Sequence, residues 1–412
     1  MYANSYSKTI ALLILINFCA CAFIEDKLGI GTNNPSQIGQ TPSDCQDTTD
    51  QGCQTPQTPS SLGTWDQMTD GPVGLLWASA AGVSGKGYVL NGCKDVFCVG
   101  NYAHKATLEF DPSMNSGLGS WTTRETFPEQ VTTSVTNYIG FGASTGNIGL
   151  FGLGVYLVQT PPINISTFHH GDIFELTPYS SSLWTKIDRP STVHADGQLD
   201  RRKNSVSLAI DQDIYLGMGS SASAVLDDWW KYDTISRNWK KLAPLPSMLS
   251  GSSAPIAQGR SDALAFSIGQ KAYVGCGLGP NDEKLSDMWE FSLPSANSPL
   301  GQWTFLGFAP FCPRSKAQAF SIGNFGYVAT GWIYDSTPLQ GDNVKNDVWK
   351  FDPSQPFDQA ITQLPSLPGE PRHAAINFVI GQNAYVGFGE GIVCSSTSCS
   401  SKYLKDIYRF TP

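Results

Sequence analysis

The sequence has little charge and no strongly basic segment. Charged residues make up 15% of its 412 positions, and the longest run of basic residues is Arg201-Arg202-Lys203. The net charge is −9 and the pI is near 5.0. Nucleic-acid binders usually carry a basic patch, because neutralising phosphates supplies most of their affinity. We therefore exclude nucleic acid as a partner.

The sequence also lacks the short motifs of common catalytic and metal sites. It contains no Ser-His-Asp order, phosphate-binding loop, H-E-x-x-H motif or EF-hand loop. The five histidines are scattered, whereas zinc needs closely grouped Cys and His ligands. The sequence therefore predicts neither a metal nor a cofactor.

Long apolar runs are missing as well, apart from a short one near the N-terminus. Lys8 precedes the apolar stretch 10–16, which is too short to span a bilayer and is typical of a signal peptide over residues 1–21. Phe18-Cys19-Ala20-Cys21 resembles a relaxed bacterial lipobox with Cys21 as the lipidated residue. Ala20-Cys21-Ala22 also satisfies the A-x-A rule for ordinary cleavage, although we favour the lipobox. We expect export, either as a cell-envelope lipoprotein that touches the membrane through its lipid alone or as a secreted protein.

Residues 22–62 are predicted to be a disordered tether. From residue 26 they are rich in Gln, Thr, Ser, Pro, Asp and Gly, so they bury too little apolar surface to offset the entropy of ordering. Eight cysteines lie beyond the signal region, and an even number in an exported chain favours disulfides over zinc. Three pairs are close in sequence: Cys45–Cys53, Cys93–Cys98 and Cys394–Cys399.

From Trp65 onward the chain repeats a pattern of short strands. One strand of each unit ends in glycine, at Gly92, Gly154, Gly219, Gly277, Gly331 and Gly389. A later strand, mostly of the form Asp-x-aromatic-x-aromatic, ends at Phe110, Leu176, Tyr232, Phe291, Phe351 and Phe410, with spacings of 66, 56, 59, 60 and 59 residues. A third strand carries Trp121, Trp184, Trp239 or Trp303 in the first four units. Such periodicity in alternating, glycine-bounded segments indicates repeated sheets.

Six units of four short strands predict an all-β fold, a six-bladed β-propeller over residues 63–412. The chain ends favour a closed ring over a solenoid, whose open ends need caps. The sixth unit stops at Pro412 without an outer strand, and residues 63–68 resemble the outer strand at 301–305. We therefore expect residues 63–68 to complete the last blade and remove two unpaired sheet edges.

These blocks resemble the kelch-repeat family. The resemblance covers residues 63–412 and is clearest in the fourth unit, with an Arg followed by YVGCG, SDMWEF and GQW. Kelch propellers include binding platforms, copper-dependent sugar oxidases and a sialic acid mutarotase, so the fold does not decide the function. No copper-ligand pattern or crosslinked Tyr–Cys pair can be matched here, which argues against an oxidase.

One position recurs on the face that would surround the mouth of the central channel. An Arg stands thirteen residues before the strand-two aromatic in units three to six, at Arg202, Arg260, Arg314 and Arg372. These groups could form an arc that binds a carboxylate or phosphate. Each could instead pair with the Asp that opens strand three of its own unit (Asp228, Asp287, Asp347 and Asp406), and the family consensus favours this reading. Units one and two lack the pair, so we expect an asymmetric binding site to lean toward them.

Other candidate ligand-binding residues fall on the same predicted face. They are Trp77, Trp332, His373 and Glu390. Exposed aromatic rings beside polar groups suit stacking against a sugar, although both tryptophans could instead pack loops against the ring. The same face should hold Cys276 of unit four and Cys312 at the entry to unit five. We predict a disulfide between these neighbouring blades, which requires Cα atoms within about 7 Å.

Two functions fit the sequence. The first is a monomeric, exported or surface-tethered binding module that recognises a protein or glycan on the channel-mouth face. The second is a carbohydrate-active enzyme resembling sialic acid mutarotase (N-acetylneuraminate epimerase), with Glu390 and an unpaired Arg372 or Arg314 as candidate groups. An unpaired Arg and a carboxylate in one central pocket would favour the enzyme. We expect the binding module.

Overall fold

The computed structural model describes residues 62–95, 104–128, 140–160, 164–246, 259–333, 343–394 and 399–412. All of them belong to one unit, Ser61–Pro412. The predicted signal peptide (1–21) with Cys21, the Cys45–Cys53 pair and, apart from Leu62, the predicted tether (22–62) lie outside the described residues.

The described residues form six four-stranded antiparallel sheets. From the innermost strand outward, the first three are β2 (Ser79–Val83), β3 (Lys86–Leu90), β4 (Ala106–Asp111) and β5 (Ser120–Thr126); β6 (Phe141–Ser144), β7 (Gly149–Gly152), β10 (Ile173–Leu176) and β11 (Trp184–Ile187); β12 (Val206–Ile210), β13 (Asp213–Gly217), β14 (Trp229–Asp233) and β15 (Asn238–Leu242). The next three are β16 (Leu264–Ile268), β17 (Lys271–Gly275), β18 (Asp287–Ser292) and β19 (Gln302–Phe308); β21 (Gln318–Ile322), β22 (Phe325–Ala329), β24 (Val348–Phe351) and β25 (Ile361–Leu364); β27 (Ile376–Ile380), β28 (Asn383–Gly387), β31 (Ile407–Thr411) and β1 (Thr64–Gln67). The prediction of an all-β fold is confirmed.

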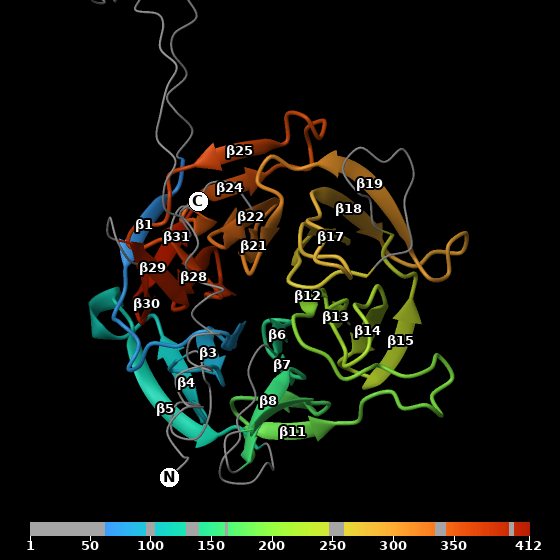
Figure 1. Ribbon diagram of the computed structural model, residues 1–412, viewed down its shortest axis with the longest axis horizontal. Coiled ribbons are helices and arrows are strands. Elements are labelled where there is room, and N and C mark those ends of the chain that lie inside the picture. The colour runs from blue at the N-terminus through green and yellow to red at the C-terminus, as the bar shows by residue number, and fades with distance from the viewer. Residues whose placement is uncertain are drawn as a thin grey trace, which may run out of the picture. The chain divides into compact units, whose positions relative to one another are not determined.

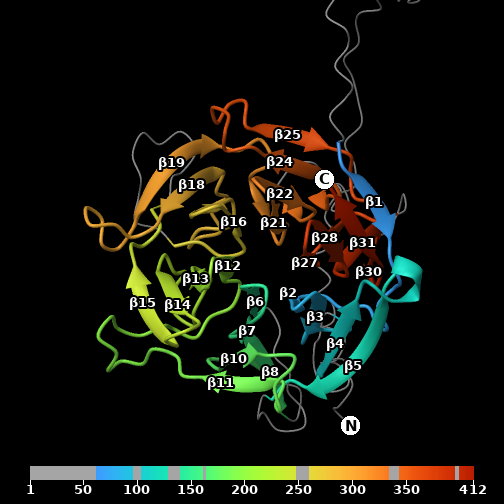
Figure 2. The ribbon, with the colours of Figure 1, turned by 180° about the vertical axis from the view of Figure 1, so that it is seen from behind.

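The sheets are arranged around a common centre, as both views of the ribbon show (Figures 1 and 2). Their innermost strands follow one another as neighbours in the order β2, β6, β12, β16, β21, β27 and back to β2. The apolar core lies between the sheets, and each cluster of buried residues joins two neighbouring ones. The cluster with Phe378 and Tyr385 of the sixth sheet and Val89 and Phe110 of the first is one of these.

The sequence pattern explains this arrangement. In β12 and β16, every second residue is large, apolar and buried. The residues between them are small, and Ser207 Oγ and Ser267 Oγ donate to the carbonyls of Gly142 and Ala209 on the neighbouring inner strands. Small residues are needed there because the inner strands converge. At Gly82, a Cβ atom would lie 2.1 Å from the carbonyl oxygen of Val379, so only glycine lets the first and sixth sheets approach this closely.

The N-terminal strand β1 lies in the same sheet as the C-terminal strand β31. The two are antiparallel, with Trp65 opposite Phe410, and their rings are 4.9 Å apart between centroids. The Arg409 guanidinium also reaches the carboxylate of Asp66 at 2.8 Å. Strand β1 therefore takes the outer position of this sheet, where the sequence predicts that residues 63–68 lie.

Extra strands lie on the face where the second strand of a sheet ends and the third begins. They are the hairpin β8 (Val155–Thr160) and β9 (Asn164–His169), the pair β20 (Arg314–Ser315) and β23 (Trp332–Ile333), and the sheet of β26 (Arg372–His373), β29 (Glu390–Cys394) and β30 (Cys399–Tyr403). We call this face the mouth face. A 3₁₀ turn at Asn115–Gly117 joins the third and fourth strands of the first sheet.

Candidate functional site

Each of the four predicted arginines on the mouth face forms a buried ion pair. The pairs are Arg202–Asp228, Arg260–Asp287, Arg314–Asp347 and Arg372–Asp406. In every pair Nη2 donates to Oδ2 at 2.6–2.8 Å, while Nη1 donates to Oδ1. The arginines are at most 2% exposed. This two-point contact is the strong, planar arrangement that arginine makes with carboxylates.

The fold supplies further partners to both members of these pairs. Each Nη1 also donates to the carbonyl of the first residue beyond the second strand of its sheet, at Met218, Cys276, Thr330 and Phe388, just before the repeated glycine. The indoles of Trp230, Trp289 and Trp349 donate to the Oδ2 of the paired aspartates. Burial alone would raise the pKa of these carboxyls, but the guanidiniums hold the pKa of Asp228, Asp347 and Asp406 below its usual value. This explains the Asp-x-Trp pattern, because the Trp indole donates to the Asp carboxylate that pairs with the Arg.

The repeated glycines connect neighbouring sheets to these arginines. The N–H of Gly219 donates to the carbonyl of Arg260 in the next sheet at 2.8 Å, and Gly154, Gly277 and Gly331 do the same toward Arg202, Arg314 and Arg372. Gly389 donates to the carbonyl of Leu75, which occupies the Arg position in the first sheet. Gly219 has φ 86°, and a Cβ there would lie 2.4 Å from the carbonyl of Lys203. The arginines are therefore part of the contact between sheets.

Three other predicted residues lie together. His373 and Glu390 are opposite each other on β26 and β29, with Nε2 and Oε2 3.5 Å apart. Trp332 packs edge-on against the His373 ring at 5.2 Å. Burial, together with the charge of Lys316, lowers the pKa of His373 to about 3, so this imidazole is neutral at physiological pH.

The fourth, Trp77, belongs to a set of five equivalent positions, and sequence reasoning singled out Trp77 but missed the other four. Two residues after each Arg position, the backbone is left-handed, at Trp77, Asn204, Asp262, Lys316 and Ala374, with φ between 48° and 56°. Trp77 N–H donates to the Ala374 carbonyl, and Ala374 N–H donates to the Lys316 carbonyl. We call these five the mouth residues. Their regular spacing from the arginines was the available signal.

The mouth residues carry unlike side chains at equivalent places. Lys316 Nζ lies 6.0 Å from the centroid of the Trp77 ring. Asn204 Nδ2 donates to Asp262 Oδ2 at 2.7 Å. Desolvation raises the pKa of Asp262, and the charges of Lys316 and Lys203 act against it. A repeated backbone thus presents an aromatic ring, an amide, a carboxylate and an ammonium group.

A cavity of about 370 Å³ lies at the centre of the ring, between the six innermost strands. Its lining is mostly Ala, Gly and Ser with buried apolar residues, and Gln318 and Asn377 provide its amides. Asn377 Nδ2 donates to Gln318 Oε1 at 2.8 Å. The lining residues include no Asp, Glu, His, Lys or Arg, so the cavity wall itself offers no acid or base.

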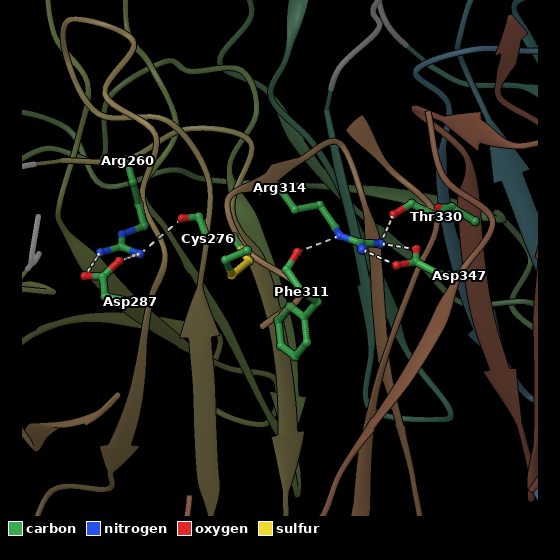
Figure 3. The surroundings of a disulfide bond; sticks show 8 residues. Arg260, Cys276, Asp287, Phe311, Arg314, Thr330 and Asp347 are labelled. Atoms are coloured by element: carbon green, nitrogen blue, oxygen red, sulfur yellow. Dashed lines mark hydrogen bonds and ion pairs between the residues drawn. A yellow bond between two sulfur atoms is a disulfide. The ribbon is translucent and has the colours of Figure 1, made fainter. Parts of the chain in front are cut away.

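The predicted disulfide between Cys276 and Cys312 is confirmed, with Cα atoms 5.5 Å apart (Figure 3). It joins the end of β17 to the segment entering the fifth sheet, between Arg260–Asp287 and Arg314–Asp347. Cys93 is disulfide-bonded, but its predicted partner Cys98 lies outside the described residues. The strand register places Cys394 opposite Cys399, and their side chains lie outside the described part.

Two features are absent from the residues that the structure describes. In that part of the chain, no group of three or more His, Cys, Asp or Glu side chains is placed to hold a metal ion. In the same part, no helix is both long and apolar enough to cross a bilayer.

A ring of four-stranded antiparallel sheets around a central cavity defines a β-propeller. Among solved structures, the chain is similar to that of the protein YjhT, with a TM-score of 0.57 and 12% identity. The similarity covers 84% of this chain and 97% of the other, and at this identity it shows the fold alone. No family model matches the chain, and the curated proteins contain no match to it.

Proposed function

We propose that residues 63–412 form a six-bladed propeller of the kelch kind, with β1 closing the ring as the outer strand of the last blade. The cyclic order of the inner strands and the pairing of β1 with β31 support this. So does the Gly389 N–H bond to Leu75, which repeats between sheets six and one the bond made by the other glycines. Closure of this kind removes sheet edges that would otherwise pair with other chains.

The chain is a binding module, exported and monomeric, whose mouth face takes a protein or glycan ligand. The observation that carries this is the contrast between the arginines and the mouth residues. The guanidinium groups are buried and bound to carboxylates of the same fold, whereas the mouth residues differ from sheet to sheet beside a central cavity. Variable side chains on a rigid repeated scaffold are the usual basis of recognition by such folds. The Cys276–Cys312 disulfide is compatible with export.

An enzyme resembling sialic acid mutarotase has weaker support. It needs an acid or base at the reacting carbon, and we expected an unpaired Arg372 or Arg314 beside Glu390 in a central pocket. Arg372 pairs with Asp406 and Arg314 with Asp347. Glu390 is only 7% exposed and faces His373. The binding module accounts for these contacts without requiring any of them to open.

A glycan array probed with the full-length chain tests this proposal. Lys316→Gln with Asp262→Asn removes both charges from the mouth at nearly constant shape and should abolish binding of the glycan recognised at the mouth. Lys271→Gln with Asp211→Asn makes the same changes at the ends of inner and second strands on the opposite face, and should leave binding intact. Equal loss in both double variants would refute a site at the mouth. If the wild-type chain binds no glycan on the array, a glycan ligand is excluded and a protein ligand remains.

A further inference from the structure

A second hollow on the mouth face lies away from the central cavity. It is a groove of about 400 Å³ between the β8–β9 hairpin of the second sheet and two loops of the third, 198–201 and 221–223. It shares no lining residue with the central cavity. Sites for small ligands typically enclose about 300–1,000 Å³. The groove is thus large enough for a ligand of its own.

One wall of the groove is aromatic. Tyr156 and Phe168 are partners across the hairpin, and their rings stack at 5.3 Å with an interplanar angle of 17°. Phe168 is 45% exposed. An open aromatic face beside polar groups packs well against a partly apolar ring, such as the C–H face of a pyranose.

The loop wall is basic. Arg201 is exposed, and no hydrogen bond or ion pair within the described residues engages its guanidinium. Nearby Arg189 differs, because it donates to the carbonyls of Gly171 and Leu199. The charged groups around the groove are Arg189, Arg201, Lys186 and Lys203 against Asp172 and Asp200, and Asp172 already pairs with Lys186 at 2.9 Å. The surplus is positive, which favours an anionic ligand.

A polar atom at the groove also lacks a partner. His169 lines it, and its Nε2 is buried without a hydrogen bond in the part of the chain that the structure describes. Burial and the charge of Lys203 lower the pKa of His169, so the imidazole is neutral. Buried polar atoms in folded proteins nearly always have a partner. A ligand hydroxyl would provide one here.

We propose that this groove binds a pyranose sugar that carries a carboxylate. The sugar ring packs on Phe168 and Tyr156, and the carboxylate meets the Arg201 guanidinium in a two-point contact. Gln198 and His169 remain for the hydroxyl groups. Asp200, which accepts a hydrogen bond from Gln198 at 2.8 Å, also accepts from hydroxyls but repels further carboxylates. This favours a sugar with one acidic group over an acidic peptide.

The experiment uses the full-length chain on arrays of acidic glycans, neutral glycans and acidic peptides. The best acidic glycan is then titrated alongside its carboxyl-reduced form, so that the two probes differ by one group. Arg201→Gln and Phe168→Ala are the test variants. Lys240→Gln on the third sheet and Tyr179→Ala, a 79% exposed ring beyond β10, are matched controls. Thermal unfolding checks that all four variants fold.

We expect Arg201→Gln and Phe168→Ala each to weaken the acidic glycan at least about tenfold, as loss of a charge-assisted hydrogen bond or a stacked ring should. Reducing the carboxyl should cost the wild type the same factor and the Arg201→Gln variant nothing more. The controls should bind as the wild type does. Silence of every acidic glycan, binding that is insensitive to Arg201→Gln, or a preference for acidic peptides would each overturn the proposal. Failure of the mouth site is distinguishable from failure of the groove. The Lys316→Gln and Asp262→Asn double variant changes no residue of the groove, so it should still bind the acidic glycan.

Discussion

Replacing Asp287 with asparagine tests whether the buried Arg–Asp pairs maintain the fold or serve a ligand. Arg260 and Asp287 have fully buried side chains. The carboxylate accepts from Arg260 Nη1 at 3.0 Å, Arg260 Nη2 at 2.7 Å and Trp289 Nε1 at 2.7 Å. An asparagine keeps the shape but turns an NH₂ group toward one of these donors and leaves the guanidinium charge uncompensated. Removing one partner of a buried pair costs about 3–5 kcal/mol.

Urea unfolding followed by tryptophan fluorescence measures this loss as a lower midpoint at unchanged slope. Asp66→Asn is the matched control, because its pair with Arg409 is largely exposed and should contribute less than about 1 kcal/mol. Arg260→Met combined with Asp287→Leu should be less destabilising than Asp287→Asn, since no unpaired charge remains. If Asp287→Asn unfolds within about 0.5 kcal/mol of the wild type, the structural role of the pairs is wrong.

Three further outcomes are expected. Replacing Cys276 and Cys312 with serine should lower the free energy of unfolding in urea by about 2–4 kcal/mol, because the bond closes a loop with a sequence separation of 36; an unchanged free energy would contradict this. Deleting residues 63–68 removes Trp65 from Phe410 and leaves the outer edge of β31 unpaired, so the thermal midpoint should fall sharply; an unchanged midpoint would contradict ring closure. The pKa of His373 falls from 6.5 to about 3 on folding, so the stability it contributes is present above pH 6.5 and lost as the pH drops toward 3; His373→Gln should reduce the loss between pH 7 and pH 5 by about 2 kcal/mol in urea unfolding, and an identical pH profile would refute this.

The strand pattern was accessible to sequence reasoning because it repeats. Alternation such as Val206 to Ile210, and the glycine that closes each second strand, recur six times and depend on local geometry. The Cys276–Cys312 disulfide followed from placing two loops on one face. Once the repeat was read, these features required no knowledge of how neighbouring sheets touch.

The binding surface was harder to predict because it depends on contacts between sheets. The left-handed backbone at Lys316 and Ala374 is fixed by hydrogen bonds from one sheet to the next, which no local pattern shows. The sequence allowed two roles for Arg260, an ion pair with Asp287 or contact with an anionic ligand. Both roles need the same residues, so the sequence could not decide between them. The β8–β9 hairpin, which carries Phe168, interrupts the repeat. The spacing of the repeat therefore could not predict that Phe168 and Arg201 of the next sheet line the same groove.

The most direct test of a ligand site at the mouth is photo-crosslinking in the full-length chain. Trp77→p-benzoylphenylalanine keeps an aromatic ring among the mouth residues and leaves Lys316 in place, and Gln382→p-benzoylphenylalanine places the probe in the turn between β27 and β28 on the opposite face. Benzophenone reacts with C–H bonds of proteins and sugars alike, so both ligand classes are detected. On the cells that produce the protein, we predict a discrete adduct from position 77 and none from position 382. An adduct from 382 alone, or equal labelling at both, would contradict a ligand site at the mouth.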